Sequence, residues 1–368
     1  MDHAEKRYED LCAIYVDLGT TNTRVWLMRG NEVLARDSRP VGVRDSAPDG
    51  STAQVRGALK ELIANVLSKT NGVSDSNLPV CVAAAGMISS PLGLAELPHL
   101  PTPAGPRELF AGTRRFEFPD ICGLPFLLVP GVRSGPAASG LQSPGQIDVM
   151  RGEETLCAGL HALGMVDPPA VVLTLGSHWK AIQLAADGRV QASVTSLSGE
   201  MIHAVRTRTI LASSVGNDWP NKLAPKWLEA GMEEQRRSGL PRALFCVRLL
   251  EINDQGTPED RFAYLIGAFI ATDLDALFAR GVLAGDPRVV ISGATAIAET
   301  WAVAFARLSM KASVLTDGET EKAFLAGLKR IVVEQILIEA ISRGESNKNS
   351  AVNQESNWRT TSDRKTGS

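Results

Sequence analysis

A carboxylate and three small polar residues lie where two apolar runs meet, in the stretch 16–27. Asp17 ends the first run, and Thr20, Thr21 and Asn22 follow Gly19. The runs predict two strands joined by a tight turn, because glycine adopts backbone angles that other residues avoid. Hydroxyl, amide and backbone N–H donors beside a carboxylate are the groups that a polyphosphate and its metal ion require. The stretch therefore predicts a phosphate-binding hairpin.

The same pattern returns 157 residues later, in the stretch 173–184. Gly176 then aligns with Gly19, and Leu184 aligns with Leu27. Each predicted hairpin is followed by a turn and a third strand. One buried hairpin is a common feature of proteins, but two copies at a constant offset indicate a duplicated domain.

Two adjacent carboxylates, Glu153 and Glu154, begin a predicted helix directly after Arg151 and a long Gly/Pro/Ser-rich loop. Carboxylates at a helix N-terminus stabilise it through the helix dipole by about 0.3–1 kcal/mol each. The position, just before the second hairpin, also suits a general base between two domains. For Glu154 both interpretations stay open, whereas we favour the catalytic one for Glu153.

The remaining elements follow from hydrophobic periodicity and from glycine and proline positions. The first half predicts strands at 11–17, 24–29 and 32–38, a helix with apolar positions from 55 to 67, a strand at 80–85, short strands within 107–130 and a loop at 131–147. The second half predicts a strand at 189–196, helices at 200–214, 225–238, 241–251 and 258–280, a buried strand at 288–295 and helices at 296–308 and 319–342. Residues 344–368 are polar and are predicted to be disordered.

Composition limits the classes of function. A chain of 368 residues is long for one core, so two domains are expected. A net charge of −3 argues against a nucleic-acid or anionic-membrane partner. No uncharged apolar run reaches about 18 residues, so no membrane helix is expected. Five widely spaced cysteines in apolar surroundings indicate reduced thiols and a cytoplasmic protein.

Several familiar sites are excluded by inspection. No two glycines are separated by a single residue, which excludes the dinucleotide-binding Gly-x-Gly-x-x-Gly loop and the protein-kinase loop. No Gly-Lys pair exists, so a Walker A loop is absent. No His-x-x-x-His or Cys-x-x-Cys pair exists either, which argues against a zinc site. An ATP site in this chain would have to be built from hairpins.

Several of these segments resemble the 2-dehydro-3-deoxygalactonokinase family of the actin-like ATPase superfamily. The segments that carry the resemblance are 17–24, 85–88, 151–155, 176–180 and 198–200, of which Arg-Gly-Glu-Glu-Thr at 151–155 is the most specific. Departures include Leu18, where an aromatic residue is frequent, and Trp179 before Lys180, where the family more often has lysine before tryptophan. The resemblance covers residues 11 to about 342.

The resemblance implies an α/β fold of two duplicated actin-like (ribonuclease H-like) βββαβα domains with an interdomain cleft. We expect residues 1–150 to hold the first hairpin and a sugar-acid pocket, and residues 151–343 to hold the second hairpin and the adenosine site. The implied activity is ATP-dependent phosphorylation of the terminal hydroxyl of a 2-keto-3-deoxy sugar acid. The first candidate is 2-dehydro-3-deoxy-D-galactonate, converted to its 6-phosphate in galactonate catabolism.

The resemblance also implies roles for individual residues. Asp17 is expected to hold Mg²⁺ through water, and Glu153, with Glu154 as the alternative, to act as the base. The residues expected to bind ATP are Gly19, Thr20, Thr21, Asn22, Gly176, Ser177, His178 and Lys180 at the phosphates, with Gly293 and Ala294 at the adenine. The residues expected at the sugar acid are Arg24, Gly86, Met87, Arg133, Arg151 and Glu200. Which arginine grips the substrate carboxylate is left open.

Other functions of the same fold remain as alternatives. A phosphatase or NTPase would use the same hairpins with water as the acceptor, and a kinase could act on a different sugar or sugar acid. A non-catalytic, nucleotide-dependent scaffold would need a large partner domain, for which the chain has no room. The expected partners are therefore small molecules, with no nucleic acid and no membrane, and the oligomeric state is left open.

Overall fold

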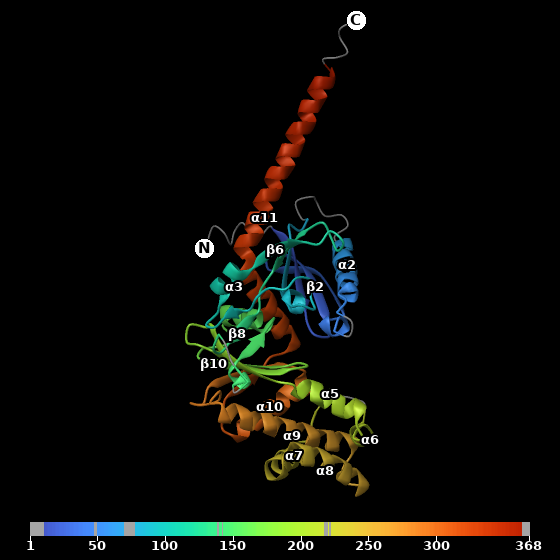
Figure 1. Ribbon diagram of the computed structural model, residues 1–368, viewed down its shortest axis with the longest axis vertical. Helices are drawn as coiled ribbons and strands as arrows, with labels where there is room; N and C mark the ends of the chain where they lie inside the picture. The colour runs from blue at the N-terminus through green and yellow to red at the C-terminus, as the bar shows by residue number, and fades with distance from the viewer. Residues whose placement is uncertain are drawn as a thin grey trace. The chain divides into compact units, whose positions relative to one another are not determined.

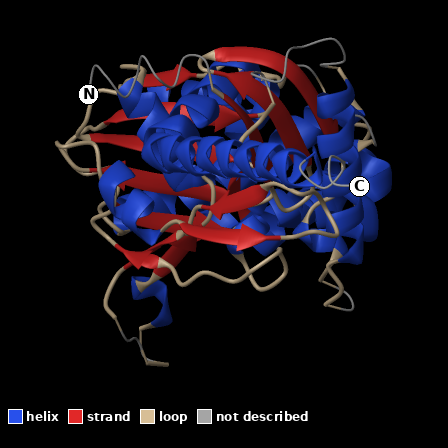
Figure 2. Cartoon of the chain, turned by 90° about the horizontal axis from the view of Figure 1, so that it is seen from above, coloured by secondary structure: helices blue, strands red, loops and turns tan. Residues whose placement is uncertain are grey.

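Two compact units make up the part of the chain that the computed structural model describes, residues 11–47, 50–69, 78–137, 140–141, 143–216, 220 and 222–362, with side chains through 340. Unit 1 comprises the chain up to Pro98, Leu109–Pro130 and the chain from Leu328 onward. Unit 2 comprises His99–Glu108 and Gly131–Gly327. Both units combine helices with strands (Figures 1 and 2).

Unit 1 is built on a sheet of strand order β3-β2-β1-β4-β7-β6. The strands are β1 (Cys12–Leu18), β2 (Thr23–Arg29), β3 (Glu32–Arg39), β4 (Val82–Gly86), β6 (Arg114–Glu117) and β7 (Pro125–Leu128). Strand β2 pairs antiparallel with both β1 and β3, β4 pairs parallel with β1 and with β7, and β6 pairs antiparallel with β7. The helices are α2 (Ala53–Ser68), the short η1 (Val43–Asp45) and η3 (Met87–Ser89), and the second part of α3 (Pro106–Gly112), which belongs to unit 1 from Leu109 onward. Helix α2 buries its predicted apolar stripe, including Leu59 and Leu62, in one cluster with the sheet residues Ile14 and Val16.

Unit 2 is built on a sheet of strand order β12-β11-β10-β13-β14. Its strands are β10 (Ala170–Leu175), β11 (Trp179–Leu184), β12 (Val190–Ser196), β13 (Arg288–Gly293) and β14 (Ala312–Val314). A separate three-stranded sheet joins β5 (Leu100–Pro101), β8 (Val132–Ser134) and β9 (Asp148–Met150). The helices are η4 (Pro144–Gln146), α4 (Glu153–Ala162), α5 (Ser198–Arg208), α6 (Ala212–Val215), α7 (Pro225–Ser238), α8 (Leu240–Ile252), α9 (Pro258–Ala279) and α10 (Thr295–Arg307). Helix α11 (Asp317–Ser362) begins in unit 2 and belongs to unit 1 from Leu328 onward.

The two sheets repeat one plan, three antiparallel strands followed by parallel strands on the other side of the first. The predicted fold class, a duplicated actin-like α/β fold, is confirmed. The offset of 157 holds for the first strands and for the third, where Ser38 corresponds to Thr195. It falls to 156 in the second strands, because Asp17 pairs with Arg24 whereas Thr174 pairs with Lys180. The second hairpin has a turn one residue shorter, so the predicted alignment of Leu184 with Leu27 is wrong by one position.

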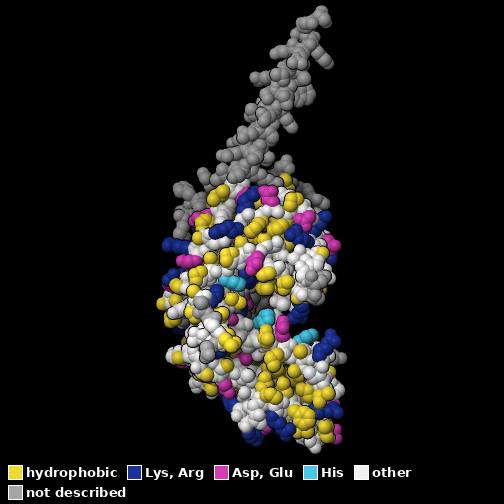
Figure 3. Space-filling view, in the orientation of Figure 1, with side chains coloured by type: hydrophobic (Ala, Val, Ile, Leu, Met, Phe, Trp, Pro, Cys, Tyr) yellow, Lys and Arg dark blue, Asp and Glu magenta, His cyan; other side chains and the backbone are white. Residues whose placement is uncertain are grey.

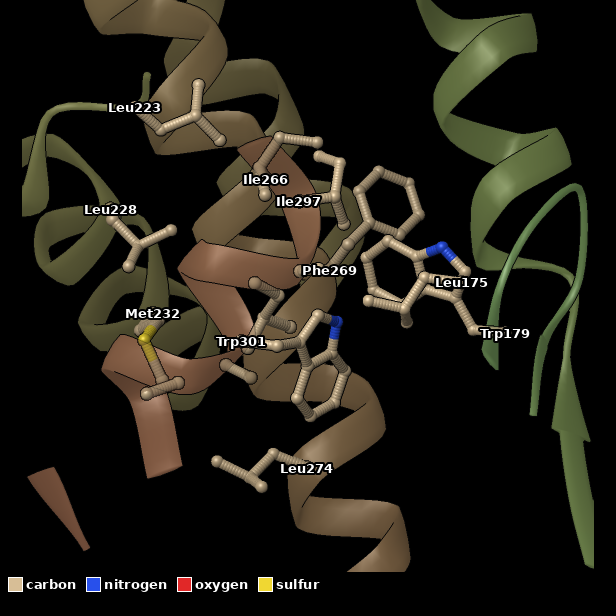
Figure 4. Packing of buried hydrophobic residues seen from close by; sticks show 14 of the residues in the cluster. Leu175, Trp179, Leu223, Leu228, Met232, Ile266, Phe269, Leu274, Ile297 and Trp301 are labelled. Atoms are coloured by element: carbon tan, nitrogen blue, oxygen red, sulfur yellow. The ribbon is translucent and has the colours of Figure 1, made fainter. Parts of the chain in front are cut away.

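Aliphatic side chains with interspersed tryptophans and phenylalanines form the core of unit 2, on one face of its sheet (Figure 4). Trp179 contacts Trp301 of α10 edge to face, with their ring centroids 5.6 Å apart. Side chains alternate along a strand, so burial of Trp179 on this face turns Lys180 to the opposite face. Helix α9 is long and apolar enough to cross a membrane by length and composition, but 67% of its most apolar window is buried inside the protein. It is the central helix of this core.

The compact units do not follow the boundary predicted at residue 150. The segments 99–108 and 131–150 belong to unit 2, because they are joined to strand β12. Asp148 of β9 accepts hydrogen bonds from Ser193 (2.5 Å) and Thr195 (2.9 Å) of β12, and Ala104 forms an isolated bridge with Val190. The residues expected in the sugar-acid pocket are therefore divided between the two units.

Three other expectations differ from the structure. Residues 106–112 form α3 where short strands were predicted, and part of the predicted loop 131–147 forms β8. The backbone of α11 continues as helix through Ser362, whereas the sequence predicted disorder from 344. Extending an existing helix avoids the cost of nucleating a new one, which explains how a polar segment continues it.

On the face drawn in Figure 3, basic and acidic side chains are interspersed.

Candidate active site

The first hairpin has a four-residue turn that its own backbone and a neighbouring segment hold in place. The N–H of Gly19 donates to the carbonyl of Asn22 at 2.8 Å and closes the turn. The N–H groups of Val43 and Arg44 donate to the carbonyls of Gly19 (3.2 Å) and Thr20 (2.9 Å). These bonds engage the turn's carbonyls.

Gly42 allows this neighbouring segment to approach the turn closely. A Cβ atom at Gly42 would lie 2.5 Å from the carbonyl carbon and oxygen of Thr20, closer than real contacts permit. Asp45 in turn accepts a hydrogen bond from the Gly42 N–H at 2.9 Å. The segment 42–45 is a support for the hairpin that the sequence analysis missed.

Asp17, the only acidic residue of β1 and β2, lies beside the turn. Its Oδ2 forms an ion pair with Arg24 of β2 at 3.1 Å, and its side chain is 21% exposed. Gly86, at the end of β4, packs against this strand with a φ of +90°. A Cβ atom there would lie 2.5 Å from the carbonyl oxygen of Leu18 and 3.3 Å from Asp17 Oδ1. Gly86 thus borders Asp17, and Met87 follows it as the first residue of η3.

The second hairpin has a three-residue turn with a similar support. The N–H of Gly176 donates to the carbonyl of His178 at 3.2 Å, and the N–H of Glu200 donates to the carbonyl of Ser177 at 2.8 Å. A Cβ atom at Gly199 would lie 2.2 Å from the Gly176 carbonyl oxygen, so this glycine repeats the close approach of Gly42 at the same offset of 157. Glu200 also lies 3.6 Å from His178 through its side chain.

Gly293 and Ala294 lie where the parallel strand β13 ends and α10 begins. Gly293 stands opposite Leu175, as Gly86 stands opposite Leu18. A Cβ atom at Gly293 would lie 2.6 Å from the Leu175 Cβ. Ala294 precedes the first residue of α10. The two units therefore repeat a glycine at the end of the central parallel strand.

Glu153 is held at both carboxylate oxygens. Lys180 Nζ lies 3.1 Å from Glu153 Oε1, and the backbone N–H of Arg151 donates to Oε2 at 3.2 Å. Lys180 also donates to the carbonyl of Val149 at 3.0 Å and is 5% exposed, whereas the Glu153 side chain is 25% exposed. The charged end of Glu153 is fixed but reaches solvent.

Glu154 has a different environment, although it is the next residue. It is 2% exposed, and the N–H of Gly152 donates to both of its oxygens, at 2.8 and 2.9 Å. Burial, reinforced by the neighbouring charge of Glu153, raises the pKa of Glu154 to about 7. Glu154 is thus a buried, partly protonated group that turns toward its own backbone.

A histidine and cationic side chains gather near Glu153 in unit 2. Strand β8 pairs Arg133 with Val149 of β9, and His99 precedes β5, the strand on the other side of β8. A Cβ atom at Gly131 would meet both Arg151 Cγ at 2.5 Å and His99 Cδ2 at 2.9 Å. Burial, together with the charges of Arg151, Lys180 and Arg133, lowers the pKa of His99 to about 4. His99 is therefore neutral at pH 7.

The structure divides the predicted site residues into two groups. Unit 1 holds those of the first hairpin with Arg24, Gly86 and Met87, and unit 2 holds Glu153, Glu154, Lys180, Arg133 and Arg151, the second hairpin with Glu200, and Gly293 with Ala294. Sequence reasoning missed His99, an isolated histidine in a Pro-rich loop. The sequence around His99 does not indicate that cationic side chains from distant segments lie near it.

Comparison with known proteins assigns the chain to a family. A model of the 2-keto-3-deoxy-galactonokinase family matches residues 17–331. The chain belongs to this family. Its members are phosphotransferases, and the predicted enzyme class is confirmed.

Relatives and solved structures agree with this family. The 2-dehydro-3-deoxygalactonokinase of Escherichia coli K12 is 24% identical over 328 residues, which cover 86% of this chain and 96% of that protein. A Rhizobium meliloti protein named as a probable 2-dehydro-3-deoxygalactonokinase is 28% identical and covers 74% of this chain and 81% of its own length. A crystal structure of a Sinorhizobium meliloti protein assigned to the same activity has a TM-score of 0.67 at 22% identity, covering 87% of this chain and 98% of that one, and it shows the shared fold.

The residues around Asp17 fit a divalent cation that keeps water among its ligands. Among the residues that the structure describes, no group of three His, Cys, Asp or Glu side chains could hold a metal ion. Mg²⁺ in phosphoryl-transfer enzymes is bound by one or two carboxylates, water and the substrate phosphates, so a complete protein cage is not required. A single carboxylate beside a polar turn fits that mode, and this 2-keto-3-deoxy-galactonokinase family member offers it at Asp17.

Proposed function

We propose that this protein is an ATP-dependent kinase that phosphorylates the terminal hydroxyl of 2-dehydro-3-deoxy-D-galactonate to give the 6-phosphate in galactonate catabolism. Family membership supports the reaction class, and the names of the two relatives support the substrate. The structural observation that carries the proposal is Glu153, a carboxylate held at both oxygens in the same unit as the cations Arg133 and Arg151.

Glu153 is the proposed general base. Phosphoryl transfer to an alcohol requires a group that takes the hydroxyl proton as the oxygen attacks the γ-phosphorus. Glu153 is fixed and 25% exposed, so a substrate hydroxyl is able to reach it. Glu154 is 2% exposed with both oxygens bound to the Gly152 N–H, which suits the start of α4 rather than proton transfer.

The two hairpin turns are the proposed phosphate-binding elements. The N–H groups of Gly19 and Gly176 close the turns, so the donors would come from Thr20, Thr21 and Asn22 in one turn and from Ser177 and His178 in the other. Asp17 would hold Mg²⁺ through water, and bound Mg²⁺ would neutralise charge on the phosphates. Gly293 and Ala294 would border the adenine.

Arg133 and Arg151 are the proposed grip on the substrate carboxylate, since guanidinium groups bind carboxylates in a bidentate manner. Arg24 is less suited, because it is already paired with Asp17 at 3.1 Å. His99, neutral beside these arginines, is able to donate an N–H to the 2-keto oxygen. Further proposed substrate contacts are Gly86 at the end of β4, Met87 at the start of η3 and Glu200 in α5.

The test is a coupled assay of ADP release with a panel of 2-keto-3-deoxy sugar acids. We expect ADP release to depend on the acceptor, to be fastest with 2-dehydro-3-deoxy-D-galactonate and to yield a 6-phosphate by ³¹P NMR. ADP release at the same rate without any acceptor would instead indicate an NTPase. Preference for a different acceptor would retain the kinase but refute the substrate.

The role of Glu153 is tested with Glu153→Gln, which keeps the size of the side chain but cannot accept a proton. We expect kcat to fall by roughly 10²–10⁴, the usual contribution of a general base, while ATP binding is unchanged. Glu154→Gln serves as the neighbouring control. A normal kcat for Glu153→Gln with a collapsed kcat for Glu154→Gln would move the base by one residue.

We also propose that the enzyme acts in the cytoplasm. All five cysteines are free thiols, as expected in a reducing compartment.

A further inference from the structure

Lys180 is a buried lysine whose ammonium has two bonding partners. It is 5% exposed, and its Nζ lies 3.1 Å from Glu153 Oε1 and 3.0 Å from the carbonyl oxygen of Val149. A charged amine withdrawn from water requires an opposite charge and hydrogen bonds to offset the lost hydration. Both of these are supplied here, the opposite charge from α4 and a carbonyl acceptor from β9.

The position of Lys180 in the duplicated fold explains why it reaches Glu153. It stands opposite Thr174, at the position that Arg24 occupies opposite Asp17 in the first hairpin. Arg24 therefore pairs with the carboxylate across the strand. Lys180 has a threonine there, and its charge is matched by a carboxylate from the helix instead.

Glu153 is consequently held between two donors. Lys180 engages Oε1, and the Arg151 N–H engages Oε2 at 3.2 Å. The second contact comes from a backbone N–H, so it does not depend on the Lys180 side chain. The first contact comes from the Lys180 side chain, so a substitution at Lys180 removes it.

We propose that Lys180 is a positioning residue that orients the Glu153 carboxylate for proton transfer, rather than a ligand of the ATP phosphates. This inference rests on the proposed role of Glu153 as the base. A misplacement of about 1 Å at a reacting group is able to cost about 100-fold in rate. Loss of Lys180 should therefore act on turnover and leave nucleotide affinity unaffected.

The first measurement compares Lys180→Met with the wild-type enzyme. We expect kcat to fall about 10- to 100-fold, while the KM for ATP and the calorimetric Kd for ADP without sugar acid stay within about twofold. Lys180→Arg, which keeps the charge, should recover part of the lost kcat. Lys69→Met is the matched control, because Lys69 also donates to a backbone carbonyl, that of Arg36 at 3.0 Å. Lys69 belongs to unit 1, whereas Glu153 belongs to unit 2.

The second measurement is a double-mutant cycle with Glu153→Gln. If Lys180 acts only through Glu153, adding Lys180→Met to Glu153→Gln should lower kcat by less than about twofold, since residues acting as a unit are not additive. The double variant also removes both charges of the pair, so it tests the inference even if Lys180→Met alone fails to fold.

Several results would overturn the inference. A rise of tenfold or more in the KM for ATP or the Kd for ADP would assign Lys180 to the phosphates. Losses of kcat that multiply in the double variant would show that Lys180 acts independently of Glu153. These results differ from failure of the proposed function, in which the wild-type enzyme itself would transfer no phosphate to any sugar acid.

Discussion

The buried carboxyl of Glu154 should make the stability of the folded protein depend on pH. Its pKa rises from 4.5 to about 7 because it is buried beside Glu153. The folded state therefore holds this proton more tightly than the unfolded state, and the resulting stability is complete below pH 4.5 and is lost as pH rises through about 7. At 1.36 kcal/mol per pKa unit, the total loss is about 3 kcal/mol.

Glu154→Gln removes this titration while keeping the shape of the side chain. In the wild type, the Gly152 N–H donates to both carboxylate oxygens, at 2.8 and 2.9 Å. The glutamine amide offers only one oxygen to this N–H, so we expect the free energy of unfolding to fall by about 1 kcal/mol at every pH. The variant should be less stable than the wild type by about 1 kcal/mol at pH 4.5 and more stable by about 2 kcal/mol above pH 7.

The assay is urea unfolding followed by tryptophan fluorescence at several pH values between 4.5 and 8. Glu96→Gln, which removes a carboxylate at an exposed position, is the control. A difference between Glu154→Gln and the wild type that stays constant across this range would refute the reasoning, because it would mean that Glu154 titrates alike in the folded and unfolded states.

Three further outcomes are expected. Asp17→Asn should abolish phosphoryl transfer without lowering the Tm, and turnover retained at saturating Mg²⁺ would contradict the role of Asp17. Gly42→Ala should lower kcat/KM for ATP about 10-fold or more, because its Cβ would lie 2.5 Å from the Thr20 carbonyl and displace the hairpin. Gly57→Ala is its control, since a Cβ in α2 meets nothing within 4 Å and should stabilise the protein by about 0.5–1 kcal/mol. Truncation after Arg343 should leave both Tm and activity unchanged, and a fall of several degrees would show that the removed segment contributes to folding.

The strands and the duplication could be predicted because their signals are local. Apolar runs, turn glycines and a constant spacing are all visible along the chain, and helices α7 to α10 begin and end within two residues of their predicted bounds. The length of the second turn could not be predicted in the same way. A turn of three residues and one of four leave similar sequences, and only the pairing of Thr174 with Lys180 distinguishes them.

The composition of the site depends on contacts between segments far apart in sequence. Arg133 and His99 reach Glu153's neighbourhood through the pairing of β5, β8 and β9, three strands of two or three residues each. Such short strands have no periodicity to recognise. The division of the chain into compact units has the same origin, since Asp148 joins β9 to β12 by side-chain hydrogen bonds.

The segments that contain Gly42 and Gly199 support the two hairpin turns from outside the sheets, so the residues of each turn can be replaced as a unit. In each copy a glycine, Gly42 or Gly199, lies close to the backbone of the turn, and strand pairing fixes the register of the two strands that the turn connects. The residues between these fixed ends, 19–22 in one copy and 176–178 in the other, differ in both length and side chains. Either turn could therefore be replaced by another sequence of three or four residues. Such a replacement would change the proposed nucleotide site without a change in the strands of the sheet.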